Sequence, residues 1–549
     1  MKLSITHWAL VVTALCMGSA CKKYVDVNNP DSLVDPTFWK TENSVRAYNW
    51  EFYNLFTGFG NGTSTNGDFY FPTLHDDQAA PGLYVYPTAP APSNGDWFFG
   101  YIRKANIMLE RIDGVAMPDE AKNHWKGVAH FFRALQYFKL VQEFGRVPWL
   151  SHSLDIGDST DIYKPLDSHQ LVMDSVLADL QFAIANLRTF DQANTINKYV
   201  ACALLSRVGV WEGAYRKYHT ELNMTDADKY YSAARDAAQT IMSSGVYTLA
   251  KSYQTAYNSL DLSGDKEILL YKRYEPAILQ HSLIAYLYSS TTMNGLSKSA
   301  VESYLCKDGL PIGLSPLYQG DTTIQAVSAN RDLRLGITID TAYLYYKGHV
   351  KNSITTTTGY RPIKYLPDSN TLKTLPTATG TNYTDAPLFW LAEVYLNYAE
   401  AVAELGTITQ TDLDNTINLL RDRGKVAHLN VNPGFTDPAK DDPSISDLLW
   451  EIRRERRVEL MMDGFRHEDL MRWKMGPKLN YGLNPDAYKG AKVPANGSVT
   501  LTPDGYITPY KLPVTRVFND PRDYLSNIPT NQILLYPASV QPTMQNPGW

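Results

Sequence analysis

The sequence predicts an all-α protein, in which a tetratricopeptide-like helical repeat body carries long loops and short strands as insertions. Three observations favour this fold class. Apolar residues recur at helical spacing along much of the chain, and several of these segments follow one another in pairs. Long segments rich in Gly, Pro, Asn and Tyr interrupt the pattern. Each predicted pair has one apolar face, so the pairs must stack on one another to bury it.

The clearest helix is predicted over residues 388–405, where Gly406 ends the pattern. Apolar and polar residues fall on opposite sides of this segment when it is drawn as a helix. The apolar stripe consists of Leu388, Leu391, Tyr395, Ala399 and Val402, and the polar stripe consists of Glu393, Asn397, Glu400 and Glu404. We therefore expect an amphipathic helix.

Predicted helices form pairs at irregular intervals. Small side chains in both members of one pair allow their backbones to approach closely. The pairs are residues 199–215 with 227–243, residues 388–405 with 413–424, and residues 121–143 with 166–187. Because the spacing between pairs is irregular, we expect an array of helix pairs that carries insertions rather than a regular solenoid.

Irregular insertions are expected near residues 58–96, 253–386 and 430–446, within a single helical domain that spans residues 37–549. Binding sites tend to lie on loops that a rigid scaffold holds in place. We therefore expect ligand recognition in the first two insertions.

The N-terminus has the features of a secretory signal over residues 1–20: Lys2, then an apolar segment, then small residues. Cys21 follows directly, as the acylated cysteine does in a bacterial lipoprotein signal. Residues 21–36 are then a lipidated tether, and the alternative is ordinary secretion with Cys21 as a spectator thiol. The apolar segment is shorter than the roughly 20 residues that a transmembrane helix needs.

Composition limits the class of partner. The formal net charge is -6, and Lys and Arg are interspersed with Asp and Glu, so no nucleic-acid partner is predicted. The chain has 37 Tyr and 11 Trp, whose rings combine an apolar face with a polar edge. Such rings suit the faces of sugars.

Catalysis has little support in the sequence. No His-Glu-x-x-His, Gly-x-Ser-x-Gly or phosphate-binding Gly motif is present, and neither a cofactor nor a metal ion is predicted. Asp76 and Asp77 are adjacent, whereas a glycosidase needs carboxylates on opposed sides of a cleft. The Arg-rich run at residues 453–457 is interspersed with Glu, which indicates a salt-bridged helix face. We predict that the chain is not an enzyme.

A sugar site needs an aromatic platform together with groups that hydrogen-bond to hydroxyls. The irregular segments supply both kinds of residue. The candidate ligand-binding residues are Asp76, Asp77, Tyr84, Tyr86, Trp97, Tyr286 and Tyr288. Packing is the alternative role for each aromatic residue, and Trp97 in particular is placed to anchor a helix predicted over residues 98–112.

Three blocks of sequence resemble the SusD/RagB family. Residues 127–134 lead to an aromatic-Gly-x-Val-Pro turn at residues 144–148. Residues 390–401 and 417–423 form the second block, and residues 455–473 form the third. The chain closes on Gln-Asn-Pro-Gly-Trp, which is similar to the terminus of that family.

The resemblance implies a tetratricopeptide-like body that is lipid-anchored and exposed at the outer-membrane surface. It further implies that the protein covers a SusC-like TonB-dependent transporter as a lid and delivers an oligosaccharide ligand to it. Two alternatives stay open on the sequence alone, a surface glycoside hydrolase and an uptake subunit that binds peptides rather than glycans.

Lipid anchoring is directly testable at Cys21. We expect Cys21→Ala to abolish labelling by radioactive palmitate and to release the protein from the membrane fraction, because the thiol that carries the lipid is gone. Unchanged labelling and membrane retention in that variant would contradict the prediction.

Overall fold

The computed structural model describes residues 38–155, 157–288, 293–495 and 497–549. The predicted signal peptide, the lipidation site at Cys21 and the tether fall outside the described residues. In the described part of the chain, no helix is both long and apolar enough to cross a membrane.

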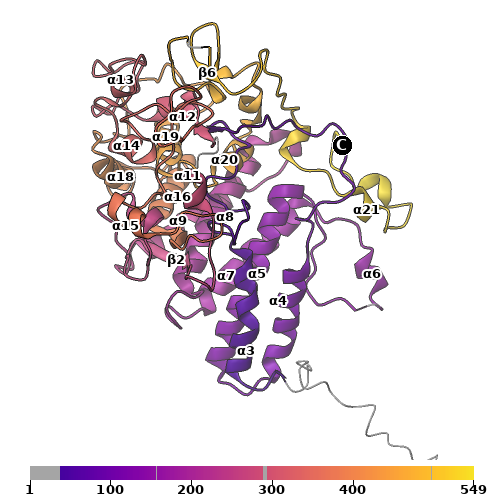
Figure 1. Ribbon diagram of the computed structural model, residues 1–549. Helices are drawn as coiled ribbons and strands as arrows, with labels where there is room; N and C mark the ends of the chain where they lie inside the picture. Colours follow the sequence, from indigo (N-terminus) through magenta and orange to yellow (C-terminus); the bar gives the residue numbers. More distant parts are fainter. Residues whose placement is uncertain (1–37, 156, 289–292, 496) are drawn as a thin grey trace, which may run out of the picture.

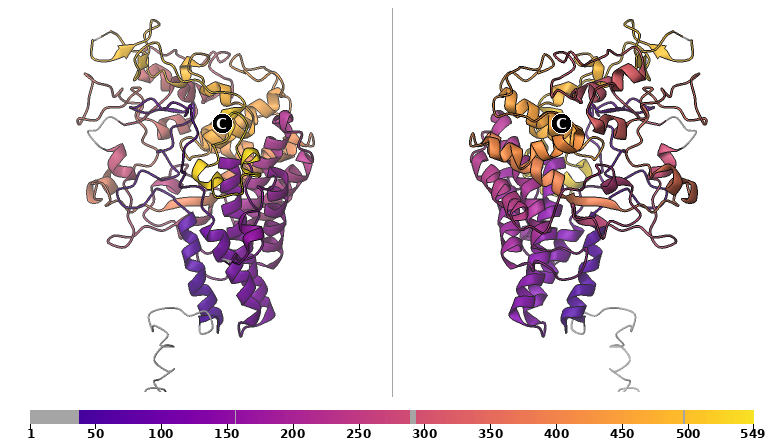
Figure 2. Two further views of the ribbon diagram at one scale, coloured as in Figure 1. Left: turned by 90° about the vertical axis from the view of Figure 1, so that its right-hand side faces the viewer. Right: turned by 90° about the vertical axis from the view of Figure 1, so that its left-hand side faces the viewer.

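Long helices pack one against the next to form a row (Figure 1). Figure 2 shows helices α4 to α9 on one side of the molecule and the less regular segments on the other. The row consists of α4 (Gly100–Arg111), α5 (Asp119–Phe144), α7 (His169–Asn186), α8 (Lys198–Tyr218), α9 (Ala227–Met242), α16 (Leu391–Glu404) and α19 (Asp447–Glu459). The predicted all-α fold class is therefore confirmed. The predicted pairs are α5 with α7, α8 with α9, and α16 with α18 (Ile417–Gly424).

Local sequence explains where these helices begin and end. The Ser168 hydroxyl accepts a hydrogen bond from the first turn of α7, and the Asn197 side chain accepts two from the first turn of α8. Gly145 follows α5 with a φ of 70°, which L side chains rarely adopt. Ser168 and Asn197 thus fix where α7 and α8 begin, and Gly145 fixes where α5 ends.

Small residues bring α8 and α9 into close contact, as predicted. A Cβ atom at Gly209 would lie 2.6 Å from the Tyr230 carbonyl oxygen and 2.7 Å from the Ala234 Cβ. Because such distances are shorter than van der Waals contact, a larger residue at position 209 would push the helices apart.

Shorter elements lie in the insertions and between the long helices. The short helices are α3 (Glu42–Asn49), α6 (Ser159–Ile162), α10 (Thr255–Asn258), α11 (Leu283–Leu287), α12 (Lys298–Ser303), α13 (Ile324–Ser328), α14 (Leu333–Thr338), α15 (Ser369–Thr374), α17 (Gln410–Asp414), α20 (Arg466–Arg472) and α21 (Thr530–Ile533). Three antiparallel pairs of strands join β1 (Gln78–Ala79) to β3 (Gly295–Leu296), β2 (Ile268–Lys272) to β4 (Ala386–Trp390), and β5 (Thr500–Leu501) to β6 (Ile507–Thr508). The pairing of β1 with β3 therefore joins the first insertion to the second.

The insertion at residues 253–386 has an aromatic core that is continuous with the helix row. Tyr257, Tyr304 and Tyr365 are buried in the same cluster as Leu396 of α16 and Val458 of α19. This region is thus a packed part of the domain, and its loops are carried on a rigid base.

One predicted helix boundary is wrong. Residues 388–390 were expected to open the helix of residues 388–405, but they belong to β4 and pair with β2. Phe389 and Trp390 are buried on the strand, so their apolar character reflects a strand buried on both faces rather than a helical stripe.

The polar stripe of α16 is buried instead of facing solvent. Glu393, Asn397 and Glu400 are at most 1% exposed, and Glu404 is 7% exposed. Each accepts a hydrogen bond from an arginine on another element, which replaces the water that burial removes. The four bonds are Arg207 to Glu393 (2.6 Å), Arg456 to Asn397 (2.8 Å), Arg472 to Glu400 (2.7 Å) and Arg453 to Glu404 (3.0 Å).

The Arg-rich run of α19 is also buried, and most of its partners come from other elements. Arg454 pairs with Glu451 of the same helix at 3.1 Å. Arg456 pairs with Asp469 of α20 at 2.8 Å, and other arginines of the run reach α16 and the first insertion. The predicted salt-bridged face thus connects several elements through the interior.

The C-terminus closes on the end of α5. The Asn546 side chain donates to the Phe144 carbonyl oxygen at 3.0 Å, and Arg146 donates to the Gln545 carbonyl oxygen at 2.9 Å. Two of the sequence blocks that resemble the SusD/RagB family therefore lie in contact.

The pair between Glu400 and Arg472 should be essential for stability. Burial alone would raise the pKa of Glu400, but Arg472 lowers it to about 2, so the pair is ionised at neutral pH. We expect Glu400→Ala to lower the free energy of unfolding by about 3–5 kcal/mol, because a guanidinium would remain buried without this counter-ion. Urea denaturation followed by circular dichroism measures the change.

The control is Asp236→Ala, which removes an exposed partner of Arg235. That variant should unfold like the unaltered protein, since exposed ion pairs contribute little. Equal denaturation midpoints for the two variants would refute the proposed role of the buried pair.

Candidate ligand-binding site

Asp76 and Asp77 are not available to a ligand, which corrects the sequence-based expectation. Each is 1% exposed, and their carboxylates face arginines of α19 and α20. Arg466 Nε lies 2.6 Å from Asp76 Oδ1, and Arg457 Nε lies 2.7 Å from Asp77 Oδ1. Burial opposes ionisation of Asp76, but Arg457 and Arg466 hold its pKa well below the usual value. These residues fasten the first insertion to the core.

Trp97, Tyr86 and Tyr84 lie apart from the second insertion. The Trp97 ring packs edge-on against Phe144 at 5.0 Å, so it anchors the chain just before α4. The Tyr86 ring packs against Phe518 at 5.3 Å, and its hydroxyl is buried. Tyr84 is 46% exposed and contacts Tyr86. Trp97 thus packs against α5, Tyr86 packs against a residue near the C-terminus, and Tyr84 packs against Tyr86.

Tyr286 lines an open pocket of about 300 Å³ where the first and second insertions meet. The pocket walls come from residues between 65 and 81, from Tyr286 of α11, and from Met293 and Asn294. Its lining residues are Thr65, Tyr70, Phe71, Thr73, Ala80, Pro81, Tyr286, Met293 and Asn294. Tyr288 lies two residues on, is 42% exposed, and has the Arg361 guanidinium 5.9 Å from its ring centre.

Backbone pairing explains why these distant segments meet. Ala79 of β1 pairs with Gly295 of β3, which places residues 80 and 81 beside residues 293 and 294. Gly295 is required there, because a Cβ atom would lie 2.1 Å from Thr358 Oγ1. On the other wall, the Ser282 hydroxyl donates to the Gly62 carbonyl oxygen at 2.8 Å. Both walls are therefore held in place without a ligand.

The pocket offers an aromatic corner and free polar groups. Phe71 and Tyr286 meet edge to face, with ring centres 5.4 Å apart. Side-chain polar atoms of Thr65, Thr73 and Asn294 have no hydrogen-bond partner among the described residues. Such hydroxyl and amide groups can donate to and accept from a bound hydroxyl.

The described lining of this pocket contains no Asp, Glu, His, Lys or Arg. A glycosidase needs an acid and a base or nucleophile at the scissile bond, and the described lining supplies no carboxyl group for either role. Only Tyr286 among the candidates chosen from sequence lines the pocket. Phe71, Thr73 and Asn294 were missed, because single loop residues have no periodic signal.

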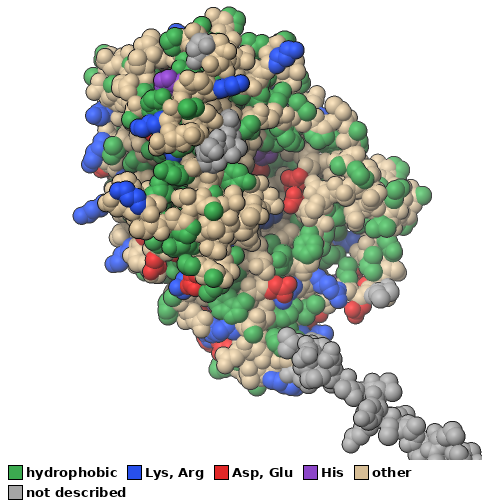
Figure 3. All heavy atoms as spheres, in the orientation of Figure 1, with side chains coloured by type: hydrophobic (Ala, Val, Ile, Leu, Met, Phe, Trp, Pro, Cys, Tyr) green, Lys and Arg blue, Asp and Glu red, His purple; other side chains and the backbone are tan. Residues whose placement is uncertain are grey.

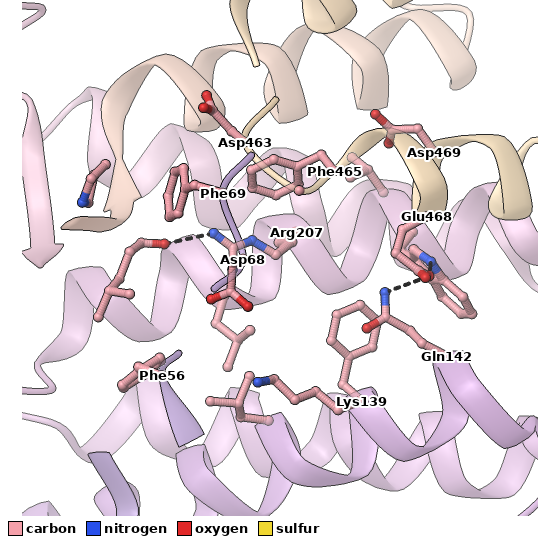
Figure 4. Close-up of a pocket in the computed structure, with 18 of the residues that line it drawn as sticks. Phe56, Asp68, Phe69, Lys139, Gln142, Arg207, Asp463, Phe465, Glu468 and Asp469 are labelled. Carbon is pink, nitrogen blue, oxygen red and sulfur yellow. Dashed lines mark hydrogen bonds between the residues drawn. The ribbon is translucent and has the colours of Figure 1, made fainter. Parts of the chain in front are cut away.

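A second cavity, of about 210 Å³, lies between α5, α8 and the turn before α20 (Figure 4). Its walls are largely apolar, and most of its polar groups already bind one another. Gln142 donates to Glu468 at 3.0 Å, and Lys139 donates to the Leu55 carbonyl oxygen at 2.8 Å. Fewer free hydrogen-bonding groups make it less suited to a sugar than the pocket at Tyr286.

The surface around the insertions does not form a basic patch. Figure 3 shows Lys and Arg scattered over the face seen in Figure 1, with uncharged and apolar side chains between them. This distribution agrees with the net charge of -6 and gives no continuous track for a phosphate backbone.

Two family models match the chain. One, described as the SusD family, matches residues 284–549, and the other, described as starch-binding associating with outer membrane, matches residues 74–210. A SusD-like protein from Formosa agariphila is 23% identical over 501 residues, which cover 86% of this chain and 91% of that protein.

Solved structures share the fold. A SusD-like carbohydrate binding protein from Bacteroides fragilis has a TM-score of 0.70 at 21% identity, over 91% of this chain and 99% of that chain. A laminarin binding SusD-like protein has a TM-score of 0.58 at 18% identity, over 93% of this chain and 100% of that chain.

Asp77 should matter for stability rather than for binding. We expect Asp77→Asn to lower the free energy of unfolding by on the order of 3 kcal/mol, because Arg457 loses a buried counter-ion. Glycan affinity of the folded variant, measured by calorimetry below its melting transition, should be unchanged.

Asp113→Asn is the matched control, since that carboxylate is 69% exposed and pairs only at the surface with Lys126. It should melt like the unaltered protein. A loss of glycan affinity in Asp77→Asn without a loss of stability would contradict the structural role.

Proposed function

We propose that this chain, which belongs to the SusD/RagB family, captures an uncharged oligosaccharide at the cell surface and passes it to a TonB-dependent outer-membrane transporter. The observation that carries the proposal is the pocket at Tyr286, an aromatic corner beside hydroxyl and amide side chains that form no hydrogen bond to another described residue. Sugar rings have apolar C–H faces and hydroxyl edges, so one pocket of this kind can contact both.

An uncharged ligand is favoured by the chemistry of the pocket walls. A charged group needs a counter-ion when it leaves water, and no described lining residue is ionisable below the pKa of tyrosine. The same argument favours a glycan over a peptide, whose ends and many of whose side chains are charged. The described lining also lacks the carboxylate pair of a hydrolase, so we propose binding without cleavage.

Anchoring and transfer are the parts of the proposal supported by the family resemblance. Lipid on Cys21 and the tether of residues 21–36 would keep the folded domain close to the membrane. The pocket is open to solvent, so an oligosaccharide can enter it directly and leave it toward a partner.

A glycan array set beside a peptide library tests the ligand class. We expect the protein that lacks residues 1–21 to bind uncharged oligosaccharides, with no binding of peptides and no release of reducing sugar. Peptide binding without glycan binding would overturn the proposal, as would cleavage of a polysaccharide.

Tyr286 should contribute directly to affinity. We expect Tyr286→Ala to weaken glycan binding by on the order of 1 kcal/mol or more, because the ligand loses one face of the aromatic corner. Calorimetry gives the affinity, and a melting curve recorded in parallel should show little change in stability.

Tyr84→Ala is the matched control, because Tyr84 is an exposed tyrosine of the first insertion outside the pocket. It should bind as the unaltered protein does. If Tyr286→Ala also binds normally, or loses binding only by unfolding, the ligand site lies elsewhere.

A further inference from the structure

The second cavity, between α5, α8 and the turn before α20, carries two charges of opposite sign where it opens to solvent. Asp68 and Lys139 both line the cavity, and both residues are exposed. Asp68 points toward α5, and the Lys139 side chain extends from α5 into the same space (Figure 4). A carboxylate and an ammonium group therefore share one opening.

Asp68 and Lys139 differ from the other charged residues of the lining. Neither has an opposite charge within 4.0 Å among the described residues. The other charged residues already have partners: Arg207 pairs with Glu393 at 2.6 Å, Arg456 and Arg472 pair with Asp469 at 2.8 and 2.9 Å, and Asp463 pairs with Lys364 at 2.8 Å. Glu468 lies 3.0 Å from His467 and accepts hydrogen bonds from Gln142 and Trp211 at 3.0 Å each.

One short segment, residues 55–58, positions both charges. The Gly58 amide donates to Asp68 Oδ2 at 3.0 Å, and Lys139 Nζ donates to the Leu55 carbonyl oxygen at 2.8 Å. Asp68 Oδ1 has no donor among the described residues, and the ammonium group of Lys139 has three hydrogens but only this one acceptor. Both groups are thus oriented before a ligand binds and can still form further hydrogen bonds.

Lys272, which does not line the cavity, interacts with the charge of Asp68 but does not pair with it. Burial lowers the pKa of Lys272, and Asp68 opposes that shift. The ammonium group of Lys272 donates instead to the carbonyl oxygens of Phe56 and Thr57, at 3.0 and 3.2 Å, and to Asn61. Asp68 can therefore accept a cationic group from a ligand.

The remaining surface of the cavity is mostly apolar and aromatic. Phe56, Phe69, Leu135, Phe138, Leu204 and Trp211 line it, and each is at most 7% exposed. An apolar group that enters such a cavity leaves water and covers these walls, which favours binding. The cavity therefore combines an apolar interior with two opposite charges at its opening.

The volume of about 210 Å³ limits the size of the ligand. Pockets for drug-sized ligands have volumes of roughly 300–1,000 Å³. The second cavity lies below that range, so it suits one small molecule rather than an oligosaccharide.

We propose that the second cavity binds a free zwitterionic α-amino acid with an uncharged, apolar side chain. The ammonium group of the ligand pairs with Asp68, its carboxylate pairs with Lys139, and its side chain contacts the aromatic walls. The charged ends of a peptide move apart by up to about 3.3–3.6 Å for each added residue. Only a single amino acid therefore presents both charges at this one opening.

Titration calorimetry of the chain that lacks residues 1–21 with leucine, and separately with phenylalanine, tests the site. We expect saturable binding of one amino acid per chain. Asp68→Asn and Lys139→Met should each weaken leucine binding about tenfold or more, because each removes a charged hydrogen-bonding partner of the ligand. Both residues are exposed, and Asn keeps an acceptor for the Gly58 amide, so both variants should fold.

Each variant has a matched control. Lys122 lies on the same helix as Lys139 and also donates to a backbone carbonyl oxygen, that of Asp113 at 3.0 Å, but it does not line the cavity. Asp261 is an exposed loop residue that accepts a hydrogen bond from the Ser263 amide at 2.8 Å. Lys122→Met and Asp261→Asn should bind leucine as the unaltered protein does. Circular dichroism confirms that every variant is folded before its affinity is measured.

Leucine analogues assign each charge to its partner. N-acetylleucine lacks the ammonium group and leucinamide lacks the carboxylate, so both should bind more weakly than leucine. Asp68→Asn should weaken the binding of leucine but not that of N-acetylleucine, and Lys139→Met should weaken the binding of leucine but not that of leucinamide. The dipeptide leucyl-leucine should bind more weakly than leucine.

Two results would overturn the proposal. One is the absence of saturable binding of leucine and phenylalanine to the unaltered protein, and the other is leucine binding that Asp68→Asn and Lys139→Met leave unchanged. The test is independent of the glycan proposal, because the second cavity and the pocket at Tyr286 have no lining residue in common. Tyr286→Ala should therefore leave leucine binding intact even if the proposed glycan function fails.

Discussion

The structure depends on a buried network of arginine and carboxylate groups that surrounds α19. Arg453, Arg456 and Arg457 of this helix reach α16, α20 and the first insertion, respectively. Glu459 of the same helix receives Arg334 of α14 at 2.7 Å. Removing either member of such a pair would leave a charge without water or counter-ion, so the elements are constrained to one arrangement.

The network also reaches the segment that precedes the proposed glycan pocket, although none of the described residues that line the pocket is charged. Arg457 holds Asp77, and Asp77 directly precedes β1. β1 pairs with β3, which places Ala80 beside Asn294 on the pocket wall. An uncharged binding surface is therefore carried on a charged scaffold. The charges confer rigidity, and the hydroxyl and amide groups of the described pocket lining are those that we propose contact the ligand.

Prediction from sequence was most successful where the pattern is local. Helical periodicity and small residues identified the helices of the row and the contact between α8 and α9. It was wrong at residues 388–390, because a short apolar run fits a buried strand as well as a helix. Of the candidate site residues, Tyr286 lines the pocket, whereas the carboxylates of Asp76 and Asp77 are held by arginines nearly 400 positions further along the chain.

The sequence by itself determined the all-α fold class, the pairing of helices and the family to which the chain is related. Each of these follows from local spacing or from short motifs. Only the tertiary structure decided which polar residues are buried and which are free. From the sequence alone, Glu400 and Asp77 are expected to be accessible to solvent. In the structure they are buried, where Glu400 pairs with Arg472 and Asp77 pairs with Arg457. Pairing between residues far apart in sequence follows from packing, so no local pattern could distinguish a structural carboxylate from one that binds a ligand.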